Sequence, residues 1–228
     1  MNCDPIARWY RWLEYGAFGR ALERRRFAFL DQVSDARRIL VLGDGDGRFL
    51  ARLVESIERV CKNDGKTLQN LAPFANRDFA IDYVDISQRM LDLARTRAGE
   101  QRITYYCGDA LNIALPPAEY DLAVTHFFLD CLDLRDAEAL IARVTRALQP
   151  QARWLISEFR EPGWWARAVV GLLYTFFRIT TGLRVRRLID HRALLASHGF
   201  ALVREETALF GLLASELWLH SGLSDNGS

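Results

Sequence analysis

The chain has 228 residues, half of them hydrophobic, and a formal net charge of +1 at pH 7. This length and composition predict a single domain with a large core and exclude general disorder. The near-neutral charge argues against a protein that binds nucleic acid through bulk electrostatics. The four cysteines are scattered without metal-ligand spacing, and the first residues lack the basic start and apolar run of a signal peptide. Both features favour a cytoplasmic protein without a metal site.

The first part of the chain predicts a helical arm followed by a strand, a glycine loop and a helix. The predicted arm spans residues 1–36, and within it residues 5–30 carry an irregular apolar stripe that is typical of helix. Residues 39–42 are aliphatic and lead directly into a loop with glycine at every second position. The apolar residues that follow, up to Cys61, recur with helical spacing. Residues 62–78 are polar and contain Asn-Asp-Gly and proline, so we expect a long loop or insertion there.

The middle of the chain alternates between strand and helix. Further strands are predicted over residues 79–84, 103–107, 120–125 and 152–159, and helices over 88–98 and 135–148. Ser87 is a suitable N-cap for the first of these helices, and Pro150 is expected to close the second. This alternation predicts an α/β fold with a parallel sheet covered by helices on both faces.

The last part of the chain predicts a helical cap and a strand pair. Residues 161–190 contain an apolar, aromatic helix over 164–181. Its uninterrupted apolar run, residues 168–177, is bounded by Arg167 and Arg178 and is too short for a membrane span of about 20 apolar residues. It is either a buried helix or dimer contact, or a lid over a hydrophobic acceptor. Arg184, Arg186 and Arg187 beside it suit an anionic acceptor or peripheral contact with a membrane. Residues 191–220 predict a short helix and two antiparallel strands, and 221–228 a disordered tail.

Three polar features fall at the carboxyl ends of successive predicted strands, where sheets of this kind bind ligands. They are the loop Gly43-Asp44-Gly45-Asp46-Gly47, then Asp85, then Gly108-Asp109. An acid at a strand end is by itself more often a helix cap or turn former. Three such features in register indicate a nucleotide-like ligand, with Asp85 suited to accept hydrogen bonds from a ribose diol.

The glycine spacing separates two classes of nucleotide-binding protein. Dinucleotide-binding enzymes use Gly-x-Gly-x-x-Gly, whereas this chain has Gly-x-Gly-x-Gly followed by Arg48. With that loop, residues 84–95, 106–110 and 120–130 resemble the class I (Rossmann-like) S-adenosylmethionine-dependent methyltransferases, a resemblance that covers roughly residues 37–160. An NAD-type oxidoreductase is the less favoured reading.

The resemblance implies a seven-stranded sheet in the order 3-2-1-4-5-7-6, with strand 7 antiparallel. It also implies S-adenosyl-L-methionine as cofactor and S-adenosyl-L-homocysteine as product, in a single domain whose cofactor-binding core spans residues 37–160. The cofactor-binding residues that it implies are Gly43, Asp44, Gly45, Gly47, Asp85, Ile86, Met90, Asp109, Ala110 and His126.

One position departs from the family pattern. The family usually has an acid two residues before the first glycine, and this chain has Val41. We consider Asp44 or Asp46 as a replacement for this missing acid. Either carboxylate would then bind the amino group of the cofactor's methionine part.

Methyl transfer requires alignment of the reacting atoms more than side-chain chemistry. If the acceptor must lose a proton, His126 is the candidate base and Asp130 its candidate orienting partner. The alternative interpretations are that His126 forms a wall of the cleft or contacts the cofactor, and that Asp130 caps the next helix. We expect a monomer or homodimer that acts on a small, hydrophobic or aromatic acceptor. The alternative is a protein of this fold that binds the cofactor, or serves as a scaffold, without transferring a methyl group.

Overall fold

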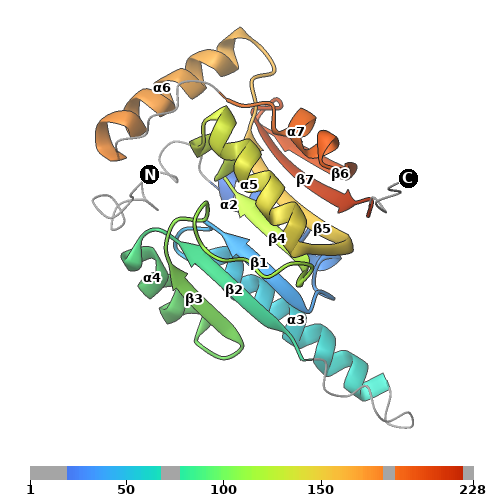
Figure 1. Ribbon diagram of the computed structural model, residues 1–228. Coiled ribbons are helices and arrows are strands. Elements are labelled where there is room, and N and C mark those ends of the chain that lie inside the picture. Colours follow the sequence, from blue (N-terminus) through green and yellow to red (C-terminus); the bar gives the residue numbers. More distant parts are fainter. Residues whose placement is uncertain (1–19, 68–77, 182–187, 223–228) are drawn as a thin grey trace, which may run out of the picture.

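The computed structural model describes residues 20–67, 78–181 and 188–222 of the chain. Seven strands form one sheet in the order β3-β2-β1-β4-β5-β7-β6, and β7 is antiparallel to both of its neighbours. The predicted strand order is therefore confirmed (Figure 1). The strands are β1 (Arg38–Leu42), β2 (Ala80–Asp85), β3 (Ile103–Cys107), β4 (Tyr120–His126), β5 (Leu148–Phe159), β6 (Phe200–Ala208) and β7 (Leu213–His220).

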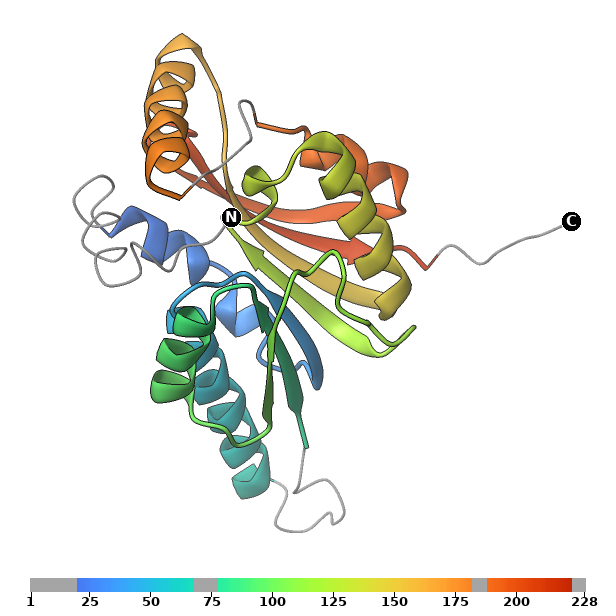
Figure 2. The same ribbon diagram turned by 60° about the vertical axis from the view of Figure 1, so that its left-hand side comes forward.

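Helices cover both faces of the sheet. One face carries α3 (Arg48–Thr67) and α4 (Gln88–Ala98), and the other carries α5 (Leu134–Ala147) and α7 (His191–Ser197) (Figure 2). The long helix α6 (Trp164–Thr181) projects beyond the end of the sheet, as both ribbon views show. The remaining elements are the short helix α2 (Ala21–Arg26) and the 3₁₀ turns η1 (Leu30–Gln32) and η2 (Leu129–Cys131).

The helix boundaries follow from local sequence. The Ser87 side chain accepts a hydrogen bond of 3.2 Å from the Met90 amide, which caps α4 as predicted. Asp190 caps α7 in the same way, with 3.1 Å between its Oδ1 and the Ala193 nitrogen. Both helices are followed by glycine at positive φ, Gly99 at 77° and Gly199 at 81°. That conformation ends a helix at little cost when the residue has no Cβ.

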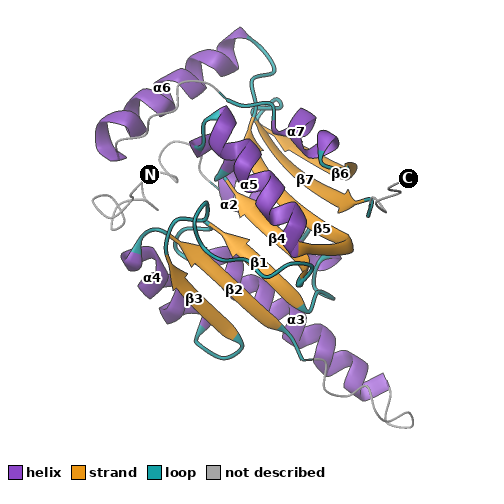
Figure 3. Cartoon of the chain, in the orientation of Figure 1, coloured by secondary structure: helices purple, strands orange, loops and turns teal. Residues whose placement is uncertain are grey.

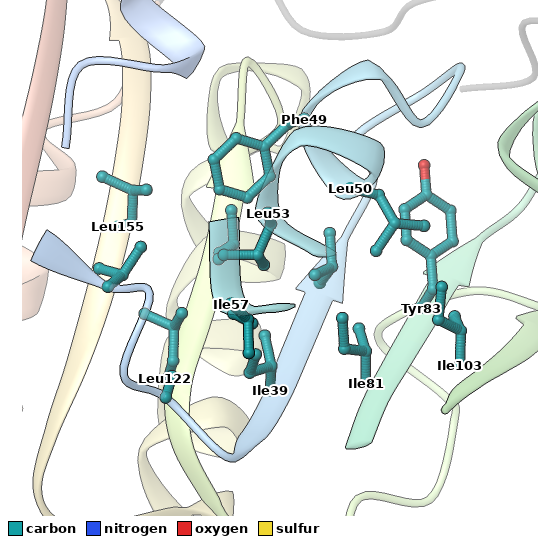
Figure 4. Close-up of a cluster of buried hydrophobic side chains, with 14 of the residues drawn as sticks. Ile39, Phe49, Leu50, Leu53, Ile57, Ile81, Tyr83, Ile103, Leu122 and Leu155 are labelled. Atoms are coloured by element: carbon teal, nitrogen blue, oxygen red, sulfur yellow. The ribbon is translucent and has the colours of Figure 1, made fainter. Parts of the chain in front are cut away.

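The core between α3 and the sheet fixes the central strands. β1 is fully buried from Ile39 to Leu42, as expected for a strand with neighbours on both sides and helices on both faces. Figure 4 shows Phe49, Leu50 and Leu53 of α3 packing onto the side chains of these strands. Burial of apolar side chains at this interface places the carboxyl ends of β1, β2 and β4 next to one another.

Three sequence-based expectations need correction, and others, including those for Arg184, Arg186 and Arg187, lie outside the described residues. Helix α3 continues to Thr67, through residues predicted as loop, because extending an existing helix costs little even across one glycine. Helix α5 ends at Ala147 and is followed directly by β5 (Figure 3). Pro150 therefore lies inside β5, which is longer than predicted. Asp133, not Asp130, caps α5. Most of the predicted helical arm, the centre of the insertion (68–77), and the tail from 223 lie outside the described residues.

β6 forms one edge of the sheet and is exposed along most of its length. Its pairing with β7 shifts register between Leu202 and Arg204, which is a bulge. Two of its acids make ion pairs with other elements: Glu205 with Arg160 and Arg192, and Glu206 with Arg25.

Within the described ranges, none of the helices is both long enough and apolar enough to span a membrane.

Candidate functional site

A pocket opens at the carboxyl ends of β1 to β4, where the sequence predicts the ligand. Seven of the ten predicted cofactor-binding residues line it: Gly43, Gly45, Asp85, Ile86, Met90, Asp109 and Ala110. Asp44, Gly47 and His126 are not among the lining residues. The structure therefore brings the ends of three strands together in one concave surface.

The three glycines of the loop are needed for different reasons. All have positive φ, at 64°, 75° and 75° for Gly43, Gly45 and Gly47. A Cβ on Gly43 would lie 2.2 Å from the Phe128 ring, and one on Gly47 would lie 2.6 Å from Ala94. A Cβ on Gly45 would meet no described atom within 4 Å. Gly43 and Gly47 thus permit close packing within the protein, whereas Gly45 leaves pocket space beside the backbone.

Side chains from β2, α3 and α4 hold the glycine loop in place. The Tyr83 hydroxyl donates a hydrogen bond of 2.8 Å to the Gly45 carbonyl oxygen. Asp46 pairs with Arg48 at 2.9 Å and with Arg97 at 2.6 Å, and Arg97 also donates to the Asp46 carbonyl. Asp46 is therefore already neutralised by protein cations.

Asp44 differs from Asp46 in its surroundings. It is 3% exposed, and neither carboxylate oxygen has a hydrogen-bond partner of normal geometry within the described ranges. Burial raises the pKa of Asp44 to about 7, and the nearby Arg26 guanidinium opposes that rise in part. The Leu50 amide near the start of α3 also favours the charged form. Of the two acids considered as replacements at the Val41 departure, Asp44 is therefore the one whose carboxylate oxygens lack a hydrogen-bond partner of normal geometry within the described residues.

Asp85 and Asp109 both line the pocket and also support local turns. Asp85 Oδ1 accepts a hydrogen bond of 2.8 Å from the Ser87 amide. Asp109 accepts from the Leu111 amide at 2.9 Å and from the Asn112 side chain at 3.0 Å. A carboxylate oxygen can accept more than one hydrogen bond, so these turns leave both residues able to bind a ligand donor.

The two candidate catalytic residues lie in separate environments. His126 is buried, and its ring meets the Phe49 ring edge-on at 4.5 Å between centroids. Burial, and then Arg26, hold the pKa of His126 well below 6.5, so the imidazole is neutral. Asp130 lies instead beside Cys131, whose thiol is 3.3 Å from its Oδ1, and near His191. A base role for His126, oriented by Asp130, stays a prediction.

One wall of the pocket is apolar and was not anticipated from the sequence. It comes from the segment after β4 and consists of Phe127, Phe128, Cys131 and Leu132. Phe127 has φ of 53°, a conformation that a bulky residue adopts only when its surroundings impose it. Sequence periodicity carries no signal for such a turn, because it indicates that the strand ends near Thr125 but not how the chain turns after it.

The comparison with protein families gives one match. Residues 59–151 match the model of a methyltransferase domain. Among curated proteins, the chain is similar to the ubiquinone/menaquinone biosynthesis C-methyltransferase UbiE of Caulobacter vibrioides strain NA1000 / CB15N, with 34% identity over 85 residues. That alignment covers 37% of this chain and 33% of the relative, so it spans about a third of the curated protein's length.

Solved structures resemble the chain over most of its length. The 1,6-didemethyltoxoflavin-N1-methyltransferase of Burkholderia thailandensis, with bound 1,6-didemethyltoxoflavin and S-adenosylhomocysteine, has a TM-score of 0.63 at 15% identity. That alignment covers 96% of this chain and 86% of the other. The N-methyltransferase NodS of Bradyrhizobium japonicum WM9, in complex with S-adenosyl-L-homocysteine, has a TM-score of 0.59 at 16% identity and 87% coverage of both chains. These likenesses show the fold.

Proposed function

We propose that the chain is a class I S-adenosylmethionine-dependent methyltransferase, because residues 59–151 match the model of a methyltransferase domain and the sheet has the strand order that the resemblance implies. We propose further that it methylates a small, hydrophobic or aromatic acceptor. The observation that carries this proposal is the pocket at the strand ends, which combines the Gly45 backbone and the Asp85 carboxylate with an apolar wall. S-adenosyl-L-methionine would supply an activated methyl group on its sulfonium.

The residues at this site suit that cofactor. Asp85 would accept hydrogen bonds from the ribose hydroxyls, and Ile86 with Met90 would flank the adenine, whose polar edge would meet Asp109 and Ala110. The buried Asp44 carboxylate lacks a partner of normal geometry within the described residues. A buried carboxylate of this kind is costly unless a cation or hydrogen-bond donor meets it. The nearby Arg26 guanidinium offsets this cost only in part. The α-ammonium group of the cofactor's methionine part is a second such cation, and both chain neighbours of Asp44 line the pocket, so we assign the ammonium group to Asp44.

The protein's contribution to methyl transfer would be alignment and exclusion of water. Positioning of reacting groups can contribute about 7–11 kcal/mol to a barrier. The apolar side chains of Phe127, Phe128 and Leu132 would exclude water from the pocket and favour an acceptor with an apolar body. The similarity to a quinone-biosynthesis C-methyltransferase supports an aromatic acceptor.

Binding and turnover test the proposal separately. Titration calorimetry with S-adenosylhomocysteine should give saturable binding at one site. Isotope-labelled S-adenosylmethionine should then transfer label to at least one member of a panel of phenols, quinols and aromatic amines. Binding without any transfer would favour the non-catalytic alternative. Binding of NAD but not of S-adenosylhomocysteine would overturn the cofactor assignment.

Asp85→Asn is expected to weaken the binding of S-adenosylhomocysteine by about 1.5–3 kcal/mol, the scale of hydrogen bonds to a charged group. Asparagine keeps an oxygen for the Ser87 amide, so the start of α4 should persist. Calorimetry measures the affinity, and Asp92→Asn on the exposed face of α4 is the control. Equal affinities for Asp85→Asn and the wild type would remove the ribose assignment.

Gly45→Ala is expected to lower cofactor affinity, and Gly99 provides a matched control. Both glycines have positive φ, 75° and 77°, and a Cβ on either meets no described atom within 4 Å. Alanine should therefore strain the backbone at each site, by about 1–3 kcal/mol. Only Gly45 lines the pocket. We expect Gly45→Ala and Gly99→Ala to lose similar thermal stability, but only Gly45→Ala to lose affinity for S-adenosylhomocysteine. Equal affinities of the two variants for that ligand would contradict the prediction.

A further inference from the structure

Glu158 is a buried carboxylate that the proposed chemistry leaves without a role. It lies near the end of β5, is 2% exposed, and is not among the described residues that line the pocket. Its Oε1 accepts hydrogen bonds from the Phe128 amide at 3.2 Å and the Leu129 amide at 2.8 Å. Its Oε2 accepts a longer one, of 3.4 Å, from the Asp130 amide. One side chain therefore binds three consecutive backbone N–H groups of the segment after β4.

The bound segment is the apolar wall of the pocket. Phe128 fits over Gly43 so closely that a Cβ there would lie within 3 Å of three atoms of the ring. The left-handed turn at Phe127 is further held by a hydrogen bond of 2.6 Å from its amide to the Ser157 carbonyl oxygen. The end of β5 thus fixes the turn, and the turn fixes the ring that covers the glycine loop.

Burying the Glu158 carboxylate at this position costs free energy that an apolar side chain would not cost. Burial, and then the neighbouring Asp130, raise the pKa of Glu158 well above 4.5, so the charged form is disfavoured. A well-packed apolar side chain often gives equal or greater stability than a buried charged group. The three amides would then lack a partner, however, and the backbone would be free to turn differently. The arrangement therefore favours a defined loop geometry over maximal stability.

We infer that Glu158 is a positioning residue, which holds residues 127–132 against the glycine loop and thereby sets the affinity of the pocket for its cofactor. This inference rests on the proposed function for the identity of the ligand. Glu158 acts through the loop and touches none of the reacting groups, so it is not a catalytic residue.

The test compares Glu158→Leu, Glu158→Gln and Ile156→Ala. Leucine removes all three acceptor bonds. Glutamine keeps an oxygen for the two shorter bonds and loses only the longest. Ile156 is fully buried on the same strand, and its replacement is the control for general destabilisation. Hydrogen exchange measures protection of the amides of residues 128–130 without ligand, and calorimetry measures binding of S-adenosylhomocysteine.

Glu158→Leu is expected to lose protection at residues 128–130 and to bind S-adenosylhomocysteine at least roughly tenfold more weakly, the effect of about one net hydrogen bond. Glu158→Gln should stay within about threefold of the wild type. Ile156→Ala should lower the melting temperature yet keep both properties. Unchanged protection in Glu158→Leu would overturn the inference, as would lost protection with unchanged affinity. If the wild-type protein does not bind S-adenosylhomocysteine, the proposed function fails, and the inferred effect of Glu158 on cofactor affinity fails with it. In that case the hydrogen-exchange data still decide whether Glu158 holds residues 127–132 in place.

Discussion

Asp44→Asn is expected to stabilise the ligand-free protein at pH 8 relative to the wild type. The pKa of Asp44 rises from 3.8 to about 7 because the group is buried, so the folded state binds its proton more tightly than the unfolded state. Its contribution to the free energy of unfolding is therefore greatest below about pH 4 and is lost as the pH rises to about 7. A rise of about three pKa units corresponds to up to about 4 kcal/mol.

Urea unfolding of both proteins at pH 5 and pH 8 measures this effect. Burial also raises the pKa of Asp130 to about 6 and that of Glu158 well above its usual range, so both proteins should lose stability with rising pH. The informative quantity is the difference between wild type and variant, which should widen from pH 5 to pH 8. A constant difference would show that Asp44 does not titrate in this range.

The affinity of the wild-type protein for S-adenosylhomocysteine is expected to fall as the pH decreases below about 7. If the ligand's ammonium group pairs with Asp44, binding requires the charged carboxylate. Below the pKa, each pH unit should then lower the affinity by up to about tenfold, because a proton must be released on binding. Calorimetry from pH 5.5 to 7.5, in buffers of different ionisation enthalpy, measures both the affinity and the released proton.

Two variants separate this effect from others. Asp44→Asn should bind weakly with little pH dependence, because its side chain does not titrate. Asp85→Asn should bind weakly but keep the wild-type slope. An affinity that is independent of pH in the wild type would exclude Asp44 as the partner of the ammonium group.

The strand order was predicted through the resemblance to a known family, whereas the strands themselves and the approximate place of the pocket were predictable because they depend on local patterns. The aliphatic run at residues 39–42 indicates a buried strand. Glycines directly after a strand indicate a tight turn with positive φ. Parallel strands joined through helices then bring Asp85 and Asp109 to the same sheet edge as Gly45. Ser87 and Asp190 could be identified as caps because capping depends on residues within one turn.

The contacts that hold the site were not predictable, because they join residues far apart in sequence. Tyr83 reaches Gly45 over 38 residues, and Glu158 reaches Leu129 over 29. A tyrosine within a strand and a glutamate at a strand end have many other uses, so nothing local distinguishes these two. The continuation of α3 past Cys61 was missed because its polar residues suit a solvated helix as well as a loop.

The position of His126 could have been predicted more closely from strand alternation. Leu122 and Val124 pack in the core between α3 and the sheet, and His126 follows at the same two-residue interval. Alternating strand residues share a face, so His126 points toward α3 and meets Phe49. The number of residues between His126 and the glycine loop gave no information about which face of the sheet the His126 side chain lies on.

The exposed edge strand β6 has a consequence for solubility. An edge strand presents N–H and C=O groups that can pair with a strand of another chain, which is a common route to aggregation. β6 combines a bulge after Leu202 with the charged run Arg204-Glu205-Glu206, and both features disfavour such pairing. Because Glu205 and Glu206 also bind arginines of neighbouring elements, replacing this pair with apolar residues would both loosen those contacts and leave a strand able to recruit further copies of the protein.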